Sequence, residues 1–510
     1  MAPTGEELAR LPGVRGQIER IAADLAAGRT CVWLMPDDLV DQGVAEDLHR
    51  AVMARWPEQV QLPEPATAPE PDEWAGEGDE WNAEADGAAW PAGPADDVPL
   101  LDGFDDGFDI GWDLPAPRRA PAPTSAEGGP SELLTRLAKE LSLDPDHALD
   151  ELTDPAVHWR PVIGIRAWTE PDPRQGTAGR AGERGHDIAR LVRALAAAIK
   201  EAGLPPEQRP RLMVTGRLRD LPPQLPDELE LELATASVHW WWGTIGRLDS
   251  ATLLTGLDGH QDHGRRPAKA GTVLRARVLR AVRAEVAGEL CGADLALAAD
   301  LFARWDGSDR TLDDCLRACL TARARAVAAD RPAVHSGAGL QHKPPSGLRR
   351  AWADGTVQAW EGRPRLHPAL WHNDGTGSRP DQVNVLVGLA QARVLTPWIE
   401  EARRALAELA LSFASRPVAE LVKLHLRTRL PDCDTHPERT FRCAEAAELQ
   451  RACLSGHISL PVEERLLLAT LVKARNRLAH RQVLRDEDLD DLCARLTAAD
   501  LRWGRDTQGL

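Results

Sequence analysis

In residues 391–510, apolar side chains recur at helical spacing within segments that prolines separate. This pattern limits the fold of this part of the chain to a set of packed helices. Pro417, Pro431 and Pro461 fall between the segments, because proline lacks a backbone N–H and clashes with the preceding helical turn. Helices joined by short connections bury their apolar faces against one another. We therefore predict a C-terminal helical bundle formed by Trp398–Phe413, Val418–Leu430, Ala444–Leu454, Val462–His480 and Asp486–Leu496.

The N-terminal portion has the pattern of an α/β fold. An amphipathic helix is predicted over Ile188–Ile199, and short apolar runs typical of buried strands occur at Thr30–Met35, Pro161–Trp168 and Arg211–Gly216. Strand, helix and strand in succession indicate a parallel unit, which the Thr30–Met35 strand completes. Residues 1–62 are thus an α/β fragment and residues 131–260 an α/β domain. No Gly-rich phosphate loop follows these strands, so nucleotide binding is not expected there.

Two further regions differ in composition from these folded parts. Residues 63–130 are rich in Pro, Gly, Ala and acidic residues, and such a segment buries too little apolar surface to offset its ordering entropy. We predict a disordered acidic insert, whose scattered Trp and Phe residues either dock a protein partner or are simply solvated. Residues 261–390 are mostly helical in pattern and are expected to connect the α/β domain to the C-terminal bundle.

The overall charge limits the kinds of partner that the chain can have. The net charge is -18, with 61 Lys and Arg against 79 Asp and Glu, which excludes a protein that wraps nucleic acid over its whole surface. Any RNA contact therefore needs a local basic patch. The sequence has no apolar run of about 18 residues and no basic, apolar start, so we expect neither a membrane span nor secretion, but a cytoplasmic location. Neither a metal nor another cofactor is expected.

The Val462–His480 segment carries the most informative motif, Arg475-Asn476-Arg477-Leu478-Ala479-His480. At about 100° per residue, the apolar stripe that faces the bundle core consists of Leu467, Leu471, Ala474 and Leu478. Asn476 and His480 fall opposite this stripe, and Arg475 lies on its flank. An imidazole transfers protons near neutral pH and a guanidinium holds phosphate, so the motif has the groups needed to cleave a phosphodiester.

Here the chain resembles the HEPN superfamily, whose motif is Arg, usually a polar residue such as Asn, then three residues and His. Arg475, Asn476 and His480 match it in type and spacing, and the helical setting agrees. Glu400 and Arg404 loosely fit the Glu-x-x-x-Lys/Arg pattern that members often carry on their first helix. The resemblance covers only the C-terminal bundle.

The resemblance implies a metal-independent endoribonuclease that forms a homodimer through the Val462–His480 helices and takes RNA as its substrate. His480 would be the general acid or base, Arg475 would neutralise the scissile phosphate, and Asn476 would orient the imidazole or the phosphate. Local positive charge would come from Lys473, Arg477 and Arg481. Many members are toxins or anti-phage defence effectors with a sensing region on the same chain, a role that the α/β portion would fill by analogy.

Two alternatives remain open. HEPN domains also occur as non-catalytic dimerisation modules, in which case the chain is a scaffold that recruits a partner through the α/β domain or the acidic insert. The loop Asp258–His263 contains two Asp and two His, and a metal-dependent hydrolase centred there is a further alternative. The three adjacent indoles of Trp240, Trp241 and Trp242 either stack on a ligand at a surface or groove, or cement the α/β domain to the next helical layer.

Overall fold

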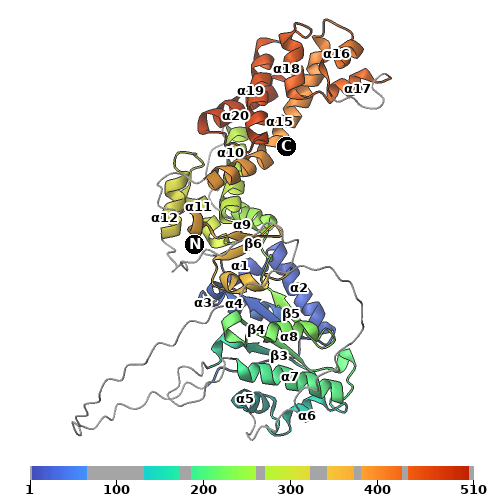
Figure 1. The fold of residues 1–510 in the computed structure, drawn as a ribbon, viewed down its shortest axis with the longest axis vertical. Helices are drawn as coiled ribbons and strands as arrows, with labels where there is room; N and C mark the ends of the chain where they lie inside the picture. The colour runs from blue at the N-terminus through green and yellow to red at the C-terminus, as the bar shows by residue number, and fades with distance from the viewer. Residues whose placement is uncertain are drawn as a thin grey trace, which may run out of the picture.

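The computed structural model describes residues 3–65, 131–171, 185–259, 270–321, 342–372, 381–427 and 435–504. The molecule is elongated, with an α/β region at one end, the C-terminal helices at the other, and long helices between them (Figure 1). The predicted acidic insert lies, from residue 66 to 130, outside the described residues, as do residues 260–263 of the loop that was a candidate metal site.

A five-stranded parallel sheet forms the α/β region, in the order β2-β3-β4-β1-β5. Its strands are β1 (Thr30–Met35), β2 (Gln59–Gln61), β3 (Val162–Arg166), β4 (Arg211–Arg217) and β5 (Ala236–Trp240). The parallel unit of β3 and β4, with β1 beside it, confirms the predicted fold. Every residue of β1 is buried, as expected for a central strand covered on both faces. β2 and β5 were not predicted.

Helices cover this sheet and supply most of the first hydrophobic core. α2 packs on β1, α4 on β3 and β4, and α8 on β5. The side chain of Trp33 in β1 is fully buried at the centre of this core. The helices of this region are α1 (Gly5–Ala9), α2 (Pro12–Ala26), α3 (Asp37–Asp41), α4 (Val44–Met53), α5 (Glu132–Leu141), α6 (Ala148–Thr153), α7 (His186–Glu201) and α8 (Leu225–Leu231).

The middle of the chain is mostly helical, as predicted, but it also contains a β-hairpin that the sequence analysis missed. β6 (Val357–Trp360) and β7 (Arg363–Leu366) pair antiparallel across Glu361 and Gly362, which both have positive φ. Positive φ at both central positions is the geometry of a tight hairpin turn. The helices are α9 (Arg247–Gly259), α10 (Ala270–Cys291), α11 (Leu295–Arg304), α12 (Leu312–Thr321), α13 (Arg349–Ala353) and α14 (Pro368–His372).

The C-terminal region is the predicted helical bundle. It consists of α15 (Asp381–Ser412), α16 (Val418–His425), α17 (Pro437–Arg442), α18 (Ala446–Leu454), α19 (Val462–Ala479) and α20 (Asp486–Arg502). α15 begins well before the expected start at Trp398, because the helix continues through Pro397. The expected boundary at residues 390 and 391 therefore falls inside α15. α17 was not predicted.

The middle helices and the C-terminal bundle share a second hydrophobic core. Its members extend from Leu254 in α9 to Ala499 in α20, and α10 packs along α15 (Figure 1). The β6–β7 hairpin instead contributes Val357, Ala359 and Trp360 to the core around the sheet. In the described part of the chain, none of the helices combines the length and the apolar content that crossing a bilayer would need.

Candidate functional site

α19 presents the motif on the side that the other helices of the bundle leave open. α19 packs against α15, α18 and α20, and its predicted core stripe is buried, with relative exposures of 0% for Leu467 and Leu471, 3% for Ala474 and 5% for Leu478. Asn476 and His480 are exposed, and Arg475 is partly exposed. The 3.6-residue period thus placed the motif correctly relative to the core.

His480 is held at the C-terminal end of α19 by the way the helix closes. The N–H of Arg481 donates to the carbonyl of Leu478 (3.0 Å), and the N–H of Gln482 donates to the carbonyl of Arg477 (2.9 Å). This is the Schellman arrangement, in which the residue after the cap adopts a left-handed conformation. Arg481 does so with φ of 53°, although it is not a glycine. His480 is the cap residue itself, so its backbone position is fixed by these bonds.

Helix α15 packs against the same turn. A Cβ built on Gly388 would lie 2.6 Å from the carbonyl oxygen of Arg481, so the two backbones meet where only a glycine fits. One turn further along α15, the buried Gln391 side chain donates to the carbonyl of Leu484 (2.9 Å) and accepts from its N–H (2.7 Å). The position of His480 therefore depends on helix α15 as well as on its own helix.

Arg475 forms an ion pair with Glu445 across to α18, with 3.1 Å between the guanidinium and the carboxylate. Glu445 is the N-cap of α18, where it forms a reciprocal capping box with Glu448. The carboxylate that pairs with Arg475 is thus itself fixed by a helix start. The sequence analysis missed Glu445; the capping signal of two glutamates three residues apart before an apolar run was the available clue.

Glu400 and Arg404, which fit the family spacing on the first helix, form no ion pair with each other. Both side chains are exposed, and Glu400 instead pairs with Arg403 at 2.7 Å. Arg403 also donates to the carbonyl of Ala444 (2.7 Å), directly before Glu445. Glu400 is therefore connected to the motif only indirectly, through the contact of Arg403 with the residue before Glu445. The sequence analysis did not single out Arg403. In the described structure, no hydrogen bond or ion pair connects Arg404 to the motif.

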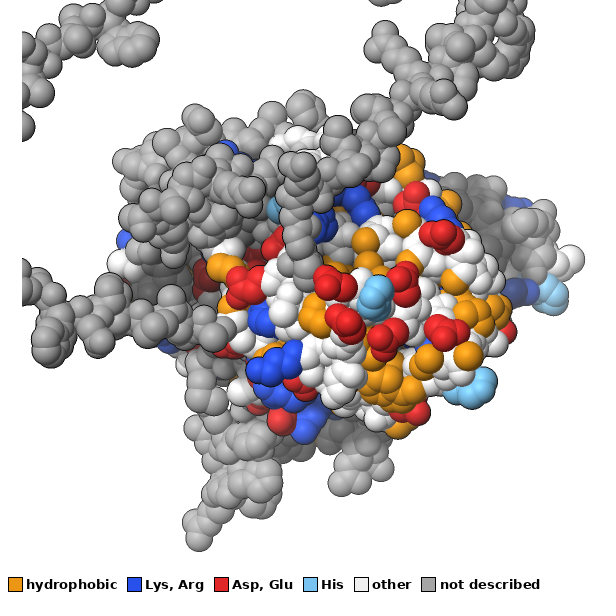
Figure 2. All heavy atoms as spheres, turned by 90° about the horizontal axis from the view of Figure 1, so that it is seen from below, with side chains coloured by type: hydrophobic (Ala, Val, Ile, Leu, Met, Phe, Trp, Pro, Cys, Tyr) orange, Lys and Arg blue, Asp and Glu red, His pale blue; other side chains and the backbone are white. Residues whose placement is uncertain are grey.

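The predicted basic patch is partly neutralised. Lys473 lies 2.6 Å from Asp488 at the start of α20, and Arg477 pairs with the same carboxylate. Asp488 thus offsets part of the charge of both cations, and the Asp491 carboxylate also acts on Lys473. Arg481 lies exposed at the turn and adds a positive charge beside the motif. On the face of the α/β end that Figure 2 shows, the described side chains are a mixture of acidic, basic and apolar groups.

Asn476 and His480 keep their polar groups available. Among the described residues, no side chain or backbone group hydrogen-bonds or ion-pairs with the amide of Asn476 or the imidazole of His480. Both groups can therefore contact a substrate or a second molecule without first giving up a partner. Arg475 must first release the Glu445 carboxylate before it can bind a substrate phosphate. An ion pair this exposed stabilises the fold by only about 0–1 kcal/mol, so the release costs little.

A possible metal site elsewhere in the described residues consists of Asp24, Cys31 and His239, whose ligand atoms lie within 4.8 Å of one another. Asp24 Oδ2 lies 3.0 Å from His239 Nε2 and accepts from the Ser237 hydroxyl at 2.6 Å. His239 and Ser237 lower the pKa of Asp24 to about 2, while burial raises the pKa of the Cys31 thiol. Asp24 already contacts His239 and Ser237, so the cluster is explained as a partly buried polar network.

Comparison of the chain with family models, with curated proteins and with solved structures finds no match in any of the three. The function of the site is therefore argued from its own residues. Arg475, Asn476 and His480 share the open side of α19, where Arg475 pairs with Glu445 of α18 and the backbone of His480 is held by the closing turn of the helix.

Proposed function

We propose that the protein is a metal-independent endoribonuclease of the HEPN type. The observation that carries the proposal is the arrangement on α19: Arg475, Asn476 and His480 lie away from the bundle core, and the imidazole is available to a substrate. A general acid or base, a phosphate-binding cation and an orienting amide within two helical turns suit phosphodiester cleavage without a metal ion.

The chemistry follows from RNA itself. A base removes the proton of the ribose 2′-hydroxyl, and the 2′ oxygen attacks phosphorus. The bond to the 5′ oxygen breaks, and an acid protonates this leaving oxygen. The products are a 2′,3′-cyclic phosphate and a 5′-hydroxyl end. One imidazole cannot be base and acid at the same moment, so two copies of His480 facing each other would supply both.

The exposed face of α19 suits such a pairing of two chains. Exposed residues recur along it at intervals of four and three, and they are Val462, Leu466, Ala469, Lys473, Asn476 and His480. The first three are apolar, with Val462 and Leu466 exposed by 58% and 43%. This spacing is the seam of paired helices, in which the apolar half would hold two chains together and the polar half would form the site.

The remaining regions would serve this nuclease, the α/β portion by analogy with the family and the insert through its scattered Trp and Phe residues. The α/β portion would sense a signal or regulate the nuclease, and the acidic insert would bind a protein partner. The proposed role of the whole protein is that of a cytoplasmic toxin or anti-phage effector. The opposing candidate, a non-catalytic scaffold, shares the dimer but not the chemistry.

A cleavage assay with chelator tests the proposal. The purified chain is incubated with single-stranded and structured RNA in EDTA, and with DNA of the same sequence, which lacks the 2′-hydroxyl. We expect cleavage of RNA only. His480→Ala should lower the rate by roughly 100-fold or more, the contribution typical of general acid–base catalysis. Arg475→Ala should lower it as well.

The matched control is His147→Ala, because His147 is an exposed histidine beside α6 in the α/β region. Its rate should equal that of the wild type. Undiminished cleavage by His480→Ala would assign the activity to a contaminant or to another site. Dimers that form normally but leave RNA intact under every condition would favour the scaffold.

A further inference from the structure

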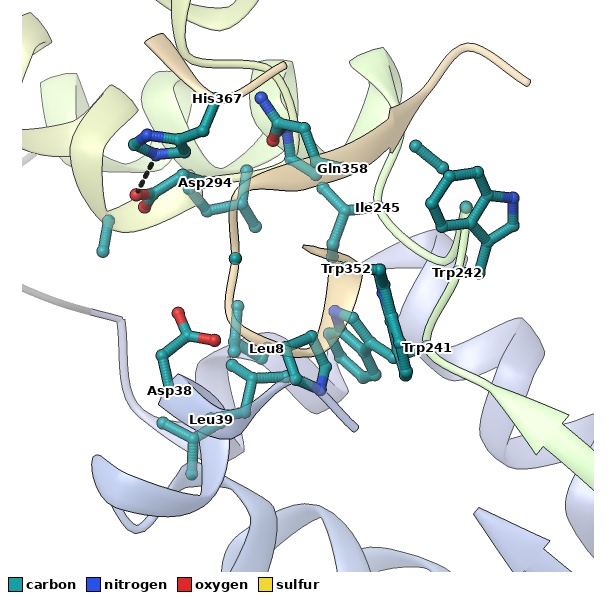
Figure 3. A pocket seen from close by; sticks show the side chains of 18 of the residues that line it. Leu8, Asp38, Leu39, Trp241, Trp242, Ile245, Asp294, Trp352, Gln358 and His367 are labelled. Carbon is teal, nitrogen blue, oxygen red and sulfur yellow. Dashed lines mark hydrogen bonds and ion pairs between the residues drawn. The ribbon is translucent and has the colours of Figure 1, made fainter. Parts of the chain in front are cut away.

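A pocket lies where the α/β region meets the helical part of the chain. Its described walls come from the residues after β1 and β5, from the start of α11 and from the β6 strand (Figure 3). The cavity has a volume of about 100 Å³. A closed apolar cavity of roughly 150 Å³ holds benzene. Gln42 lines this pocket and is exposed, so the cavity opens to solvent there and suits one ring whose substituent stays at the mouth.

The pocket occupies the position at which open α/β sheets bind ligands. β1 ends at Met35 and β5 ends at Trp240, and the lining residues Pro36 and Trp241 follow directly after these two ends. The two strands are parallel neighbours, so both carboxyl ends lie at the same edge of the sheet. Crevices at this edge are the usual binding sites of the fold class.

Indole rings form much of the described wall, which is lined by Trp241, Trp242 and Trp352. Other indoles pack behind two of them. The ring of Trp241 lies 5.9 Å from that of Trp33 in β1, and Trp352 packs edge-on against Trp240 at 5.3 Å between ring centroids. This packing holds the aromatic wall in place, as in the largely preformed sites of small ligands. The three adjacent indoles after β1's neighbour β5 are all buried, so they do cement the layers, and two of them also face the cavity.

Polar side chains on the helical side of the pocket are held by the protein itself. The Gln358 side chain donates to the carbonyl of Cys291 (3.1 Å) and accepts the backbone N–H of Ala293 (2.7 Å). Asp294 is the N-cap of α11, and its carboxylate lies 3.2 Å from His367 Nε2, as Figure 3 shows. These bonds fix the shape of the wall, so a ligand gains mainly from the rings and the apolar surface.

We propose that this pocket binds a small neutral molecule with one aromatic ring. Contacts between aromatic rings are favourable beyond the apolar area that they bury, and a flat ring can make them with the indoles of the wall. Leu8, Leu39 and Ile245 line the same cavity and exclude water from the ring. A charged group carried into the cavity would lose its hydration, whereas a hydroxyl can stay at the mouth beside Gln42. The site is separate from the proposed ribonuclease site, and its existence does not depend on cleavage activity.

A ligand-observed NMR titration of the full chain tests the proposal with four probes of similar size: benzyl alcohol, cyclohexylmethanol, benzylammonium and benzoate. Cyclohexylmethanol keeps the hydroxyl but lacks the aromatic ring, and the last two probes keep the ring but carry a charge. We expect saturable binding of benzyl alcohol at one site, roughly threefold or more tighter than that of cyclohexylmethanol. Both charged probes should bind at least about tenfold more weakly than benzyl alcohol.

Ala296→Leu places the site in this pocket, because Ala296 lines the cavity from α11 and leucine fills space there without weakening the helix. It should weaken the binding of benzyl alcohol at least about tenfold. Ala303→Leu is the matched control, since it adds the same side chain at an exposed position of the same helix and should bind like the wild type.

Leu39→Trp is a second variant should Ala296→Leu not fold, because it fills the pocket from α3 on the opposite side, where Leu39 is partly exposed (Figure 3). It should weaken binding to a similar degree. Equal affinity for the two alcohols, tighter binding of either charged probe, or unchanged affinity for benzyl alcohol in a folded pocket-filling variant would overturn the proposal.

Discussion

Arg475 and His480 differ in what holds them, although they belong to one motif. The guanidinium is held by Glu445 on another helix, whereas the imidazole has only its backbone position fixed. An ion pair that orients a cation and then exchanges for phosphate suits substrate binding. An exposed imidazole at a helix end suits proton transfer, since a substrate can reach its ring nitrogens.

The sequence revealed which residues of the motif face outward, but not what they touch. A helical period fixes the exposure of Asn476 and His480 because both depend on one helix. Glu445 and Asp488 approach from α18 and α20, and their positions follow from how helices cross. The sequence analysis therefore expected more positive charge around the motif than the structure has, because it did not place the acidic start of α20 beside Lys473.

His49 gives a pH dependence that can be measured at the residue scale. It is 1% exposed, and its ring nitrogens lie 2.8 Å from the Thr215 hydroxyl and the Gln61 side-chain oxygen. Burial lowers the pKa of His49 from 6.5 to about 4. The unfolded chain therefore binds a proton between these pH values that the folded chain does not, so stability falls as pH drops through this window.

We expect this group alone to remove about 2 kcal/mol of unfolding free energy between pH 7 and pH 5. Urea unfolding at both pH values measures the drop in the wild type and in His49→Gln, whose amide can keep the two hydrogen bonds. The drop should be smaller in the variant by about that amount. Equal drops would show that His49 is not buried in its neutral form.

At the scale of elements, the contact between α15 and the turn after α19 should control the site without touching substrate. In Gly388→Ala the new methyl group meets the backbone of Arg481 at 2.6 Å, so one of the two must move. We expect a loss of about 1–3 kcal/mol in stability, typical of overpacking, and cleavage reduced because His480 shifts.

Gly256→Ala is the control for this variant. Gly256 lies in helix α9 with nothing within 4 Å of a built Cβ, so alanine should be neutral or stabilising by up to about 1 kcal/mol. Thermal unfolding and cleavage rates are compared for the two variants. A Gly388→Ala protein as stable and active as Gly256→Ala would show that the contact does not position the turn.

Elements were predictable where their signal was local. β1, β3 and β4 are continuous apolar runs, and α7 has an apolar stripe, so all four follow from the sequence. β2 has three residues that are not buried and carries no such signal. Pro397 is a residue type typical of a helix start, yet α15 continues through it. A helix can do so where packing against its neighbours compensates for the hydrogen bond that proline cannot donate.

At the scale of the whole molecule, α11 takes part in both cores, because Leu295 lies in the core around the sheet and Leu297 in the core of the helical part. The sequence indicated separate regions because composition changes along the chain. It could not indicate that residues 261–390 divide between both cores, since that depends on contacts distant in sequence.

Dimer formation through α19 is the prediction that belongs to this scale. Leu466→Glu places a charge on the apolar half of the exposed face and should weaken self-association at least about tenfold, with folding intact. Leu233→Glu is the control, since Leu233 is 73% exposed in the α/β region. Sedimentation velocity over a concentration series measures both. A wild type that stays monomeric, or equal association of both variants, would contradict the paired site.

The ends of the RNA fragments released in EDTA test the central claim most directly. The wild type is predicted to leave 2′,3′-cyclic phosphate and 5′-hydroxyl ends, because the 2′ oxygen is the nucleophile and His480 transfers the protons. His480→Ala should release almost none of them. Fragments with 5′-phosphate ends, or cyclic phosphate ends formed equally fast by His480→Ala, would contradict the assignment of this motif as a metal-independent ribonuclease site.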